Sequence, residues 1–573
     1  MNGMTISANN GPMLNAYPDS MGGTLADIIK FLEKPELKDV FSSFYILPSL
    51  FNTDLDRGFS VIDYTLNNLL ASREDLDALE ALGIDLKLDF ILNHASVLSK
   101  QFQDIIKNGE QSKYKDFFIN WNKFWEGHGT MTEEGYIQPD PEMIEHMFFR
   151  KPGLPILMVR FPDGKNIPYW NTFYQEVKYP VLDAQDIMSV AGIQYTIANK
   201  VAEYVNKGLA AGLALSEIFA GNKSGEEQAD AADQIADRLS TTQKKAIIDM
   251  LESRRKYLGQ MDLNTKSPMV WEFYEETLKT LSNYGAKIVR LDAFAYAQKE
   301  PGEKNFLNEP GTWQLLEKVQ KLADRYNLSL LPEIHSSYAE KTYELLSQKG
   351  YMTYDFFLPG LVIDALESGT GKHLVEWAKE LSTKKIRVVN MLGCHDGIPL
   401  LDLKGMLPEE RIQQLIQIIV DRGGYVKNLH GQKNMYYQVN ATYYSALGED
   451  DRKLLLARAI QMFMPGKPQV WYLDLFAGKN DYDAVNRAGV GGHKDINRSN
   501  LSEDQINELM KLPVVTKQLE LIQLRNSYPA FGFDAKLNVQ SNGTKIIFEW
   551  ENNGSIARLD ADLNSFEYVI SLN

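Results

Sequence analysis

The sequence predicts an α/β fold: a (β/α)8 barrel with an inserted domain after its third strand and a small antiparallel β domain at its C-terminal end. Short β-branched apolar runs alternate with segments of helical periodicity, which is typical of parallel strands joined by crossover helices. This alternation stops after His94 and resumes near Ser267. From about Ala530 apolar and polar residues alternate around Asn-Gly turns, which indicates antiparallel strands.

Eight strands are expected in the barrel, because eight apolar runs with strand-like composition can be counted along the chain. They cover residues 13–19, 41–50, 85–94, 287–292, 329–333, 354–358, 386–391 and 468–473. Helical periodicity is expected at residues 25–33, 69–82, 268–283, 313–326, 338–348, 371–382 and 503–526.

The domain boundaries follow from this alternation. The barrel is expected to cover residues 1–94 and 265–529, the inserted domain 95–264, and the C-terminal β domain 530–573. Within the inserted domain, an Ala-, Glu- and Gln-rich stretch at about 187–258 has helical periodicity. We expect this helical insertion to pack over the barrel rim. The alternatives are a lid and an oligomer contact, with a homodimer as the candidate assembly.

Composition excludes several classes of protein. The chain has 573 residues and a net charge of −16, and no basic block that could neutralise a nucleic-acid backbone. It has no apolar run near the length of a membrane span and no leader-like N-terminus, so we expect a cytoplasmic protein. A single cysteine, Cys394, excludes an internal disulfide, and no His/Cys spacing indicates a metal site. We expect neither metal nor cofactor.

Charged residues stand where the barrel strands are expected to end. Arg290 and Asp292 close the strand Lys287-Ile-Val-Arg-Leu-Asp292, and Glu333 follows 41 residues later, about one strand-helix-strand repeat. The carboxyl ends of barrel strands form one face, which is where such barrels carry their chemistry. Asp396 follows the seventh strand. Taken alone, Arg290 and Asp292 fit a structural ion pair equally well.

Two facing carboxyl groups suit the cleavage of a glycosidic bond. One attacks the anomeric carbon, and the other, kept protonated, donates its proton to the leaving oxygen. His94 and His395 each lie at the C-terminal edge of a different strand, which favours binding of sugar hydroxyls over a purely structural role.

Four short motifs resemble those of the α-amylase superfamily of glycoside hydrolases. They are residues 89–94, 288–292, 331–333 and 393–396, in the expected order at the expected strand ends. The resemblance implies that Asp292 is the nucleophile, Glu333 the general acid/base and Asp396 the stabiliser of the transition state. It further implies that His94, Arg290 and His395 hold the glucosyl ring.

Within that superfamily the chain is most similar to the sucrose phosphorylase subfamily, through segments such as 56–59, 152–155, 438–447 and 495–498. The resemblance implies that Asp56 and Arg498 bind the far hydroxyls of the glucosyl unit; a surface ion pair is the alternative. Tyr296 would line the phosphate or acceptor side, and Gln438 would touch the acceptor. The candidates for an anion site are Arg150, Lys151, Lys427 and His430, for which solvated loop charges are the alternative. Sucrose phosphorylase has an arginine where this chain has Lys151.

The expected function is that of a retaining α-glucosyl phosphorylase. It would cleave sucrose with phosphate to α-glucose 1-phosphate and fructose through a covalent glucosyl-Asp292 intermediate. The expected partners are a small sugar and inorganic phosphate, not nucleic acid or a membrane. The alternatives are a phosphorylase of sucrose 6'-phosphate, glucosylglycerol or glucosylglycerate, an α-glucosidase or transglucosidase, and a non-catalytic sugar-binding barrel.

Overall fold

The computed structural model describes residues 9–150, 153–220, 239–428, 436–489 and 492–573. Its centre is a parallel sheet with the strand order β14-β13-β5-β2-β1-β20-β16-β15. The two end strands of this order, β14 and β15, approach one another, so the sheet nearly closes into a barrel. The eight strands are β1 Met13–Ala16, β2 Ser43–Ile46, β5 Asp85–Ile91, β13 Ala286–Asp292, β14 Ser329–Pro332, β15 Thr353–Asp355, β16 Val388–Met391 and β20 Lys467–Trp471. The predicted fold class is confirmed.

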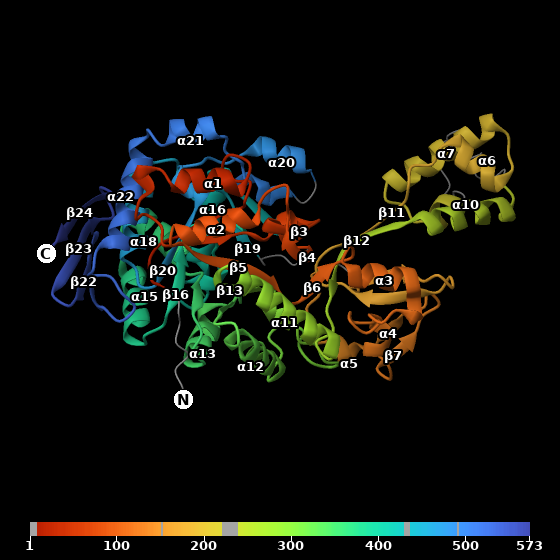
Figure 1. The fold of residues 1–573 in the computed structure, drawn as a ribbon, viewed down its shortest axis with the longest axis horizontal. Coiled ribbons are helices and arrows are strands. Elements are labelled where there is room, and N and C mark those ends of the chain that lie inside the picture. Colours follow the sequence, from red (N-terminus) through yellow and green to blue (C-terminus); the bar gives the residue numbers. More distant parts are fainter. Residues whose placement is uncertain (1–8, 151–152, 221–238, 429–435, 490–491) are drawn as a thin grey trace.

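Helices surround this sheet (Figure 1). They are α1 Leu25–Leu32, α2 Arg73–Ala81, α11 Pro268–Asn283, α12 Gly311–Asp324, α13 Thr342–Gln348, α14 Leu358–Ser368, α15 Lys372–Thr383, α16 Glu409–Asp421, α18 Asp451–Phe463, α21 Glu503–Leu509 and α22 Pro513–Ser527. Their apolar faces and the strands form one continuous core. Among the described residues, no helix combines the length and the apolar character needed to cross a membrane.

Two differences from the predicted elements have clear causes. The single helix expected at 503–526 is two helices, because Pro513 lacks a backbone N–H and begins α22 at its first turn. The strand expected at 354–358 ends at Asp355, and Leu358 already begins α14. This helix is almost entirely buried, so its apolar residues show no face that sequence periodicity could detect.

The segment after β5 forms two smaller structures. Aromatic residues near Trp121, Trp125 and Trp170 make one compact cluster. Beyond it, the antiparallel pair β11 (Gln175–Lys178) and β12 (Lys256–Asp262) leads to α6 Ala184–Ala191, α7 Tyr195–Ala210, α8 Leu215–Ala220 and α10 Thr241–Arg254.

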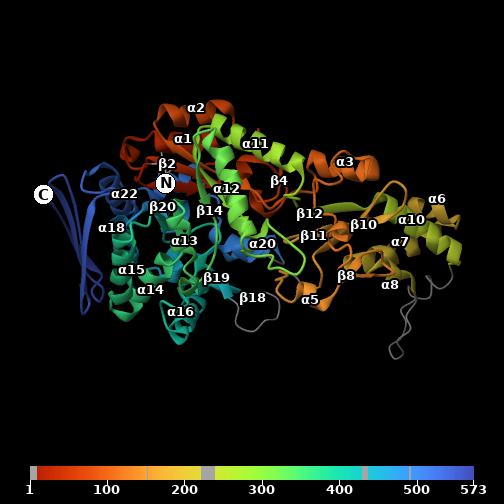
Figure 2. The ribbon, with the colours of Figure 1, turned by 90° about the horizontal axis from the view of Figure 1, so that it is seen from below.

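The helical insertion has a core of its own, built from residues such as Ile187, Val201, Val205, Ile247 and Leu251. Figures 1 and 2 both show its helices standing away from the barrel, at one end of the long axis of the molecule. The expectation that it packs over the barrel rim is therefore wrong for the described residues, because its apolar side chains pack on one another.

The C-terminal sheet lies at the opposite end of the molecule (Figure 2). Its four antiparallel strands are β21 Lys536–Asn542, β22 Lys545–Asn552, β23 Ser555–Asp562 and β24 Glu567–Leu572. In contrast to the insertion, its inner face belongs to the barrel core: Phe548 and Trp550 are buried there, and the Trp550 Nε1–H donates to the carbonyl of Phe463 in α18 at 2.8 Å.

Candidate active site

Arg290 connects three carboxylates at the carboxyl ends of neighbouring strands. It lies in β13 directly opposite Asp89 of β5 in the strand register. Its Nη1 donates to Asp89 at 2.6 Å and to Asp292 at 2.8 Å, and its Nη2 lies 3.0 Å from Glu333. The structure thus brings Asp292 and Glu333 to one buried guanidinium, as their spacing in the sequence predicts for neighbouring strand ends.

The backbone conformation after Asp292 allows a hydrogen bond to Glu333. Ala293 has φ 50°, in the left-handed region that a residue with a Cβ seldom adopts. In this conformation the Ala293 N–H donates to Glu333 at 3.2 Å. Such local strain commonly accompanies functional sites.

Asp396 is held by a histidine and two cationic side chains. Its carboxylate lies 3.2 Å from His395 Nε2, 2.6 Å from Lys494 Nζ and 3.8 Å from Arg498 Nη2. Burial acts to raise the pKa of Asp396, but His395, Lys494 and Arg498 outweigh it and hold this pKa well below the usual value. Asp396 is therefore ionised throughout the neutral range.

Phe59 arranges the two histidines predicted to bind sugar. Its backbone carbonyl lies 2.9 Å from His94 Nε2, and its ring stacks on the ring of His395 at 5.0 Å. Burial lowers the pKa of both histidines, so both rings are neutral at pH 7. Asp56 lies in the same loop, with its carboxylate 3.8 Å from Arg498 Nη1, so these two predicted residues come together.

The predicted acceptor side is partly described. Arg150 Nη1 donates to the Tyr296 hydroxyl at 3.1 Å, and its guanidinium lies 5.0 Å from the centre of the Phe173 ring. Gln438 is buried in β19 (Tyr436–Asn440), beside Pro399 in the strand register. Lys151 and His430 lie outside the described residues, and Lys427 is described only as a member of strand β18 (Tyr425–Asn428).

The pKa values of Asp292 and Glu333 shift in opposite directions although both groups contact Arg290. Burial raises the pKa of Asp292 well above its usual value, against the pull of Arg290. Burial acts in the same direction on Glu333, but Arg290 and His335 outweigh it and lower its pKa to about 2. The ligand-free site therefore pushes the two pKa values apart, with that of Asp292 the higher of the two.

The structure adds three site residues that were not among the predicted set. Asp89 accepts a hydrogen bond from Arg290. It is the first residue of the motif at 89–94, but it was not predicted to be a site residue. Lys494 contacts Asp396 from η8 (Gly492–Asn497), and no pattern in the sequence distinguishes it from other surface lysines. Asp402 lies 3.4 Å from His335, whose other ring nitrogen is 3.6 Å from Glu333, and only the fold brings these residues together.

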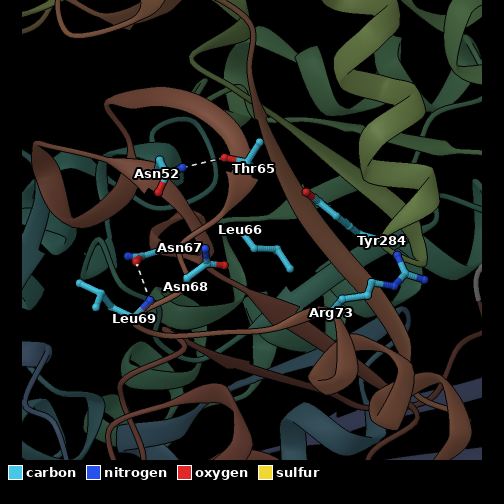
Figure 3. A pocket seen from close by; sticks show the side chains of 8 residues that line it. All are labelled: Asn52, Thr65, Leu66, Asn67, Asn68, Leu69, Arg73 and Tyr284. Atoms are coloured by element: carbon cyan, nitrogen blue, oxygen red, sulfur yellow. Dashed lines mark hydrogen bonds between the residues drawn. The ribbon is translucent and has the colours of Figure 1, made fainter.

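An open polar pocket of about 560 Å³ lies elsewhere, between the β3–β4 hairpin (Phe51–Thr53 and Val61–Leu66) and Tyr284 (Figure 3). Asn52, Asn67 and Arg73 are among its lining residues, and none of the predicted site residues lines it. We therefore place the candidate active site at the strand-end carboxylates. In the part of the chain that the structure describes, no group of three or more His, Cys, Asp or Glu side chains converges as a metal site would require.

Known proteins resemble the chain over its full length. A sucrose 6(F)-phosphate phosphorylase from Ilumatobacter coccineus is 48% identical and aligns with 99% of this chain and 97% of its own. A sucrose phosphorylase from Streptococcus mutans is 30% identical, with 98% of each chain covered. No family model matches the chain.

Solved structures agree with these relatives. The crystal structure of sucrose 6F-phosphate phosphorylase from Thermoanaerobacter thermosaccharolyticum superposes with a TM-score of 0.78 at 31% identity, covering 100% of this chain and 97% of that one. An α-amylase from H. orenii shares the fold alone, with a TM-score of 0.57 at 15% identity and coverage of 97% of this chain and 90% of that one. The predicted resemblance to the sucrose phosphorylase subfamily is confirmed: the chain belongs to the sucrose phosphorylase and sucrose 6(F)-phosphate phosphorylase family.

Proposed function

We propose that this protein is a retaining α-glucosyl phosphorylase whose donor is sucrose 6F-phosphate, and that sucrose is the second candidate donor. The observation that supports glucosyl transfer is the contact of Arg290 with both Asp292 and Glu333, within 3.0 Å of each. Phosphate as the acceptor is supported by the relatives, which are named phosphorylases. The choice of donor is supported by the relatives: the 48% identical protein and a second one at 32% are both named sucrose 6(F)-phosphate phosphorylases. The 30% identical sucrose phosphorylase supports the second candidate.

The proposed reaction has two displacements at the anomeric carbon. Asp292 attacks this carbon while Glu333 gives its proton to the glycosidic oxygen, so the fructosyl group leaves and a β-glucosyl ester of Asp292 forms. A phosphate oxygen then attacks the same carbon, Glu333 takes back a proton, and the ester bond breaks to release α-glucose 1-phosphate. Two inversions give net retention.

The charges around the two carboxylates support roles for Asp396 and His335. Asp396, held ionised by its neighbouring cations, stabilises the positive charge that develops on the glucosyl ring. His335 lies beside Glu333, with its Nε2 3.6 Å from that carboxylate. Burial acts to lower its pKa, but Asp402 and Glu333 outweigh it and raise the pKa to about 9. A cationic His335 favours anionic phosphate over water as the attacking group.

Asp292 and Glu333 must exchange the order of their pKa values for the first displacement. Without a ligand the pKa of Asp292 is raised and that of Glu333 is lowered, whereas this step needs Asp292 ionised and Glu333 protonated. We infer that the donor drives this exchange, because its leaving oxygen accepts a hydrogen bond only from a protonated Glu333, and its ring excludes water from that carboxyl group.

The test is release of α-glucose 1-phosphate from sucrose 6F-phosphate and from sucrose, each with inorganic phosphate. We expect release from the wild type, and a loss of at least about a thousandfold in Asp292→Asn and Glu333→Gln with the fold retained by circular dichroism. Substantial phosphorolysis by Asp292→Asn would contradict the covalent mechanism. Glucose as the only product at saturating phosphate would favour an α-glucosidase instead, and no turnover of any α-glucoside would favour a non-catalytic barrel. Glucosylglycerol and glucosylglycerate belong in the same donor panel.

A further inference from the structure

Lys87 is a buried lysine inside the barrel that the proposed reaction does not use. It lies in β5, two residues before Asp89, and its side chain is inaccessible to solvent. Its Nζ donates to the hydroxyl of Tyr354 in β15 and to Gln469 Oε1 in β20 at 2.7 Å. It also lies 3.9 Å from the centre of the Tyr45 ring in β2. Lys87 therefore contacts strands on several sides of the barrel at once.

Stability alone does not account for this residue. Burying an amino group is costly, and Lys87 forms no salt bridge with any described carboxylate to offset that cost. Burial, reinforced by Arg290, lowers its pKa well below the usual value. An apolar side chain of the same length would fill the space without this cost, so the polar contacts of Lys87 must serve another purpose.

One set of contacts leads from Lys87 to Asp292. The Tyr45 ring faces Lys87, and its hydroxyl donates to Asp89 Oδ2 at 2.8 Å. The other oxygen of Asp89 accepts the 2.6 Å hydrogen bond from Arg290, which in turn donates to Asp292.

A second set of contacts leads from Lys87 to Glu333. The Tyr354 ring, fixed by its hydroxyl contact with Lys87, stacks on Phe356 at 5.0 Å and 16°. Phe356 stacks on His335 at 3.8 Å and 17°, and His335 lies 3.6 Å from Glu333.

We propose that Lys87 is a positioning residue: it fixes the two tyrosine rings from which Asp292 and Glu333 are oriented. This inference rests on the proposed roles of the two carboxylates, although it applies equally to transfer of the glucosyl group to phosphate or to water. Displacing a reacting group by about 1 Å can cost on the order of a hundredfold in rate. Lys87 does not touch the substrate, so its loss should affect the chemical step rather than donor binding.

The principal test is Lys87→Met, which removes the amino group and keeps the length of the side chain. We expect kcat to fall by about 10- to 100-fold while KM for the donor changes less than about threefold. The matched control is Lys467→Met. Lys467 is equally buried, in β20, but its Nζ donates to Asn9 and Gly11 oxygens rather than to either tyrosine. Lys467→Met should lose stability and keep the kcat of the folded enzyme.

Two variants that each remove a single oxygen atom test the two sets of contacts separately. They also keep the proposal testable if Lys87→Met does not fold. Tyr45→Phe removes the hydroxyl that binds Asp89, and Tyr354→Phe removes the hydroxyl that binds Lys87. Each should lower kcat. Lys87→Met combined with Tyr354→Phe should lose less than the product of the two single losses, because both changes break the same contact.

Three results would overturn the proposal: a kcat within twofold of wild type in Lys87→Met, a loss expressed entirely in KM, or equal losses of kcat in Lys87→Met and Lys467→Met. A wild-type chain that turns over no α-glucoside with phosphate or water overturns this proposal together with the proposed function. An active wild type with an equally active Lys87→Met overturns this proposal alone.

Discussion

At the scale of the residue, Lys494 helps to keep Asp396 ionised. It is the nearest cation to this carboxylate, at 2.6 Å, and it is one of the groups that hold the pKa of Asp396 well below its usual value. The proposed mechanism needs Asp396 ionised when the glucosyl ring gains positive charge. A group with a depressed pKa stays ionised until the pH falls through that lowered value, so Lys494 extends activity toward acid.

We expect Lys494→Met to raise the pKa of Asp396 and to move the acid limb of the pH profile of kcat/KM to higher pH. Lys494→Arg keeps the positive charge and should leave the limb close to that of wild type. The measurement is kcat/KM from about pH 4 to pH 8, with Lys479→Met as the control, because Lys479 pairs with Glu449 at an exposed position. An unchanged acid limb in Lys494→Met would contradict this prediction and would mean that His395 and Arg498 alone keep the pKa of Asp396 low.

The contrast between Asp292 and Lys494 shows what the sequence can and cannot predict. Asp292 stands at the end of an apolar strand, and the barrel pattern alone assigns that position to the active-site face. Lys494 lies in a short helical turn more than ninety residues after Asp396 in the chain. No local sequence pattern predicts that it contacts this site. The contact of Asp402 with His335 is likewise created by the fold.

At the scale of the element, the pair of β11 and β12 explains how the helical insertion is attached. Lys178 and Lys256 lie directly opposite one another in the antiparallel register. The chain therefore leaves and returns at adjacent points, and residues 179–255 occupy the place of a hairpin loop. Sequence periodicity predicted these helices but not this attachment, because strand register depends on pairing between distant segments.

We expect the insertion to be removable. Replacing residues 179–255 by Asn-Gly should close a two-residue hairpin, because this turn matches the twist of antiparallel strands. The shortened chain should fold and keep kcat within about threefold of wild type. Steady-state kinetics and circular dichroism are the measurements. A loss of kcat above about tenfold in a folded variant would instead assign the insertion a part in catalysis, such as that of a lid.

At the scale of the whole molecule, the two outlying parts differ in how they join the barrel. The core of the helical insertion is separate from that of the barrel. The C-terminal sheet has no such independence, since Phe548, Trp550 and Leu559 belong to the same buried cluster as the barrel strands and helices. We infer that the sheet unfolds with the barrel and that the insertion unfolds by itself.

A matched pair of core truncations tests this difference. Trp550→Ala removes a buried ring and its hydrogen bond to Phe463, which should cost about 3–5 kcal/mol of the barrel's free energy of unfolding. Ile247→Ala opens a cavity in the core of the insertion at a cost of about 2–5 kcal/mol to that part alone. Calorimetry with activity measured along the same temperature scale should show the loss of activity moving to lower temperature in Trp550→Ala. In Ile247→Ala the temperature at which activity is lost should not change, while a separate unfolding transition at lower temperature, that of the insertion, should move lower still. If both variants lowered the inactivation temperature equally, the molecule would unfold as a single cooperative unit. In a molecule with two independent cores, a truncation in the insertion would leave the stability of the barrel unchanged.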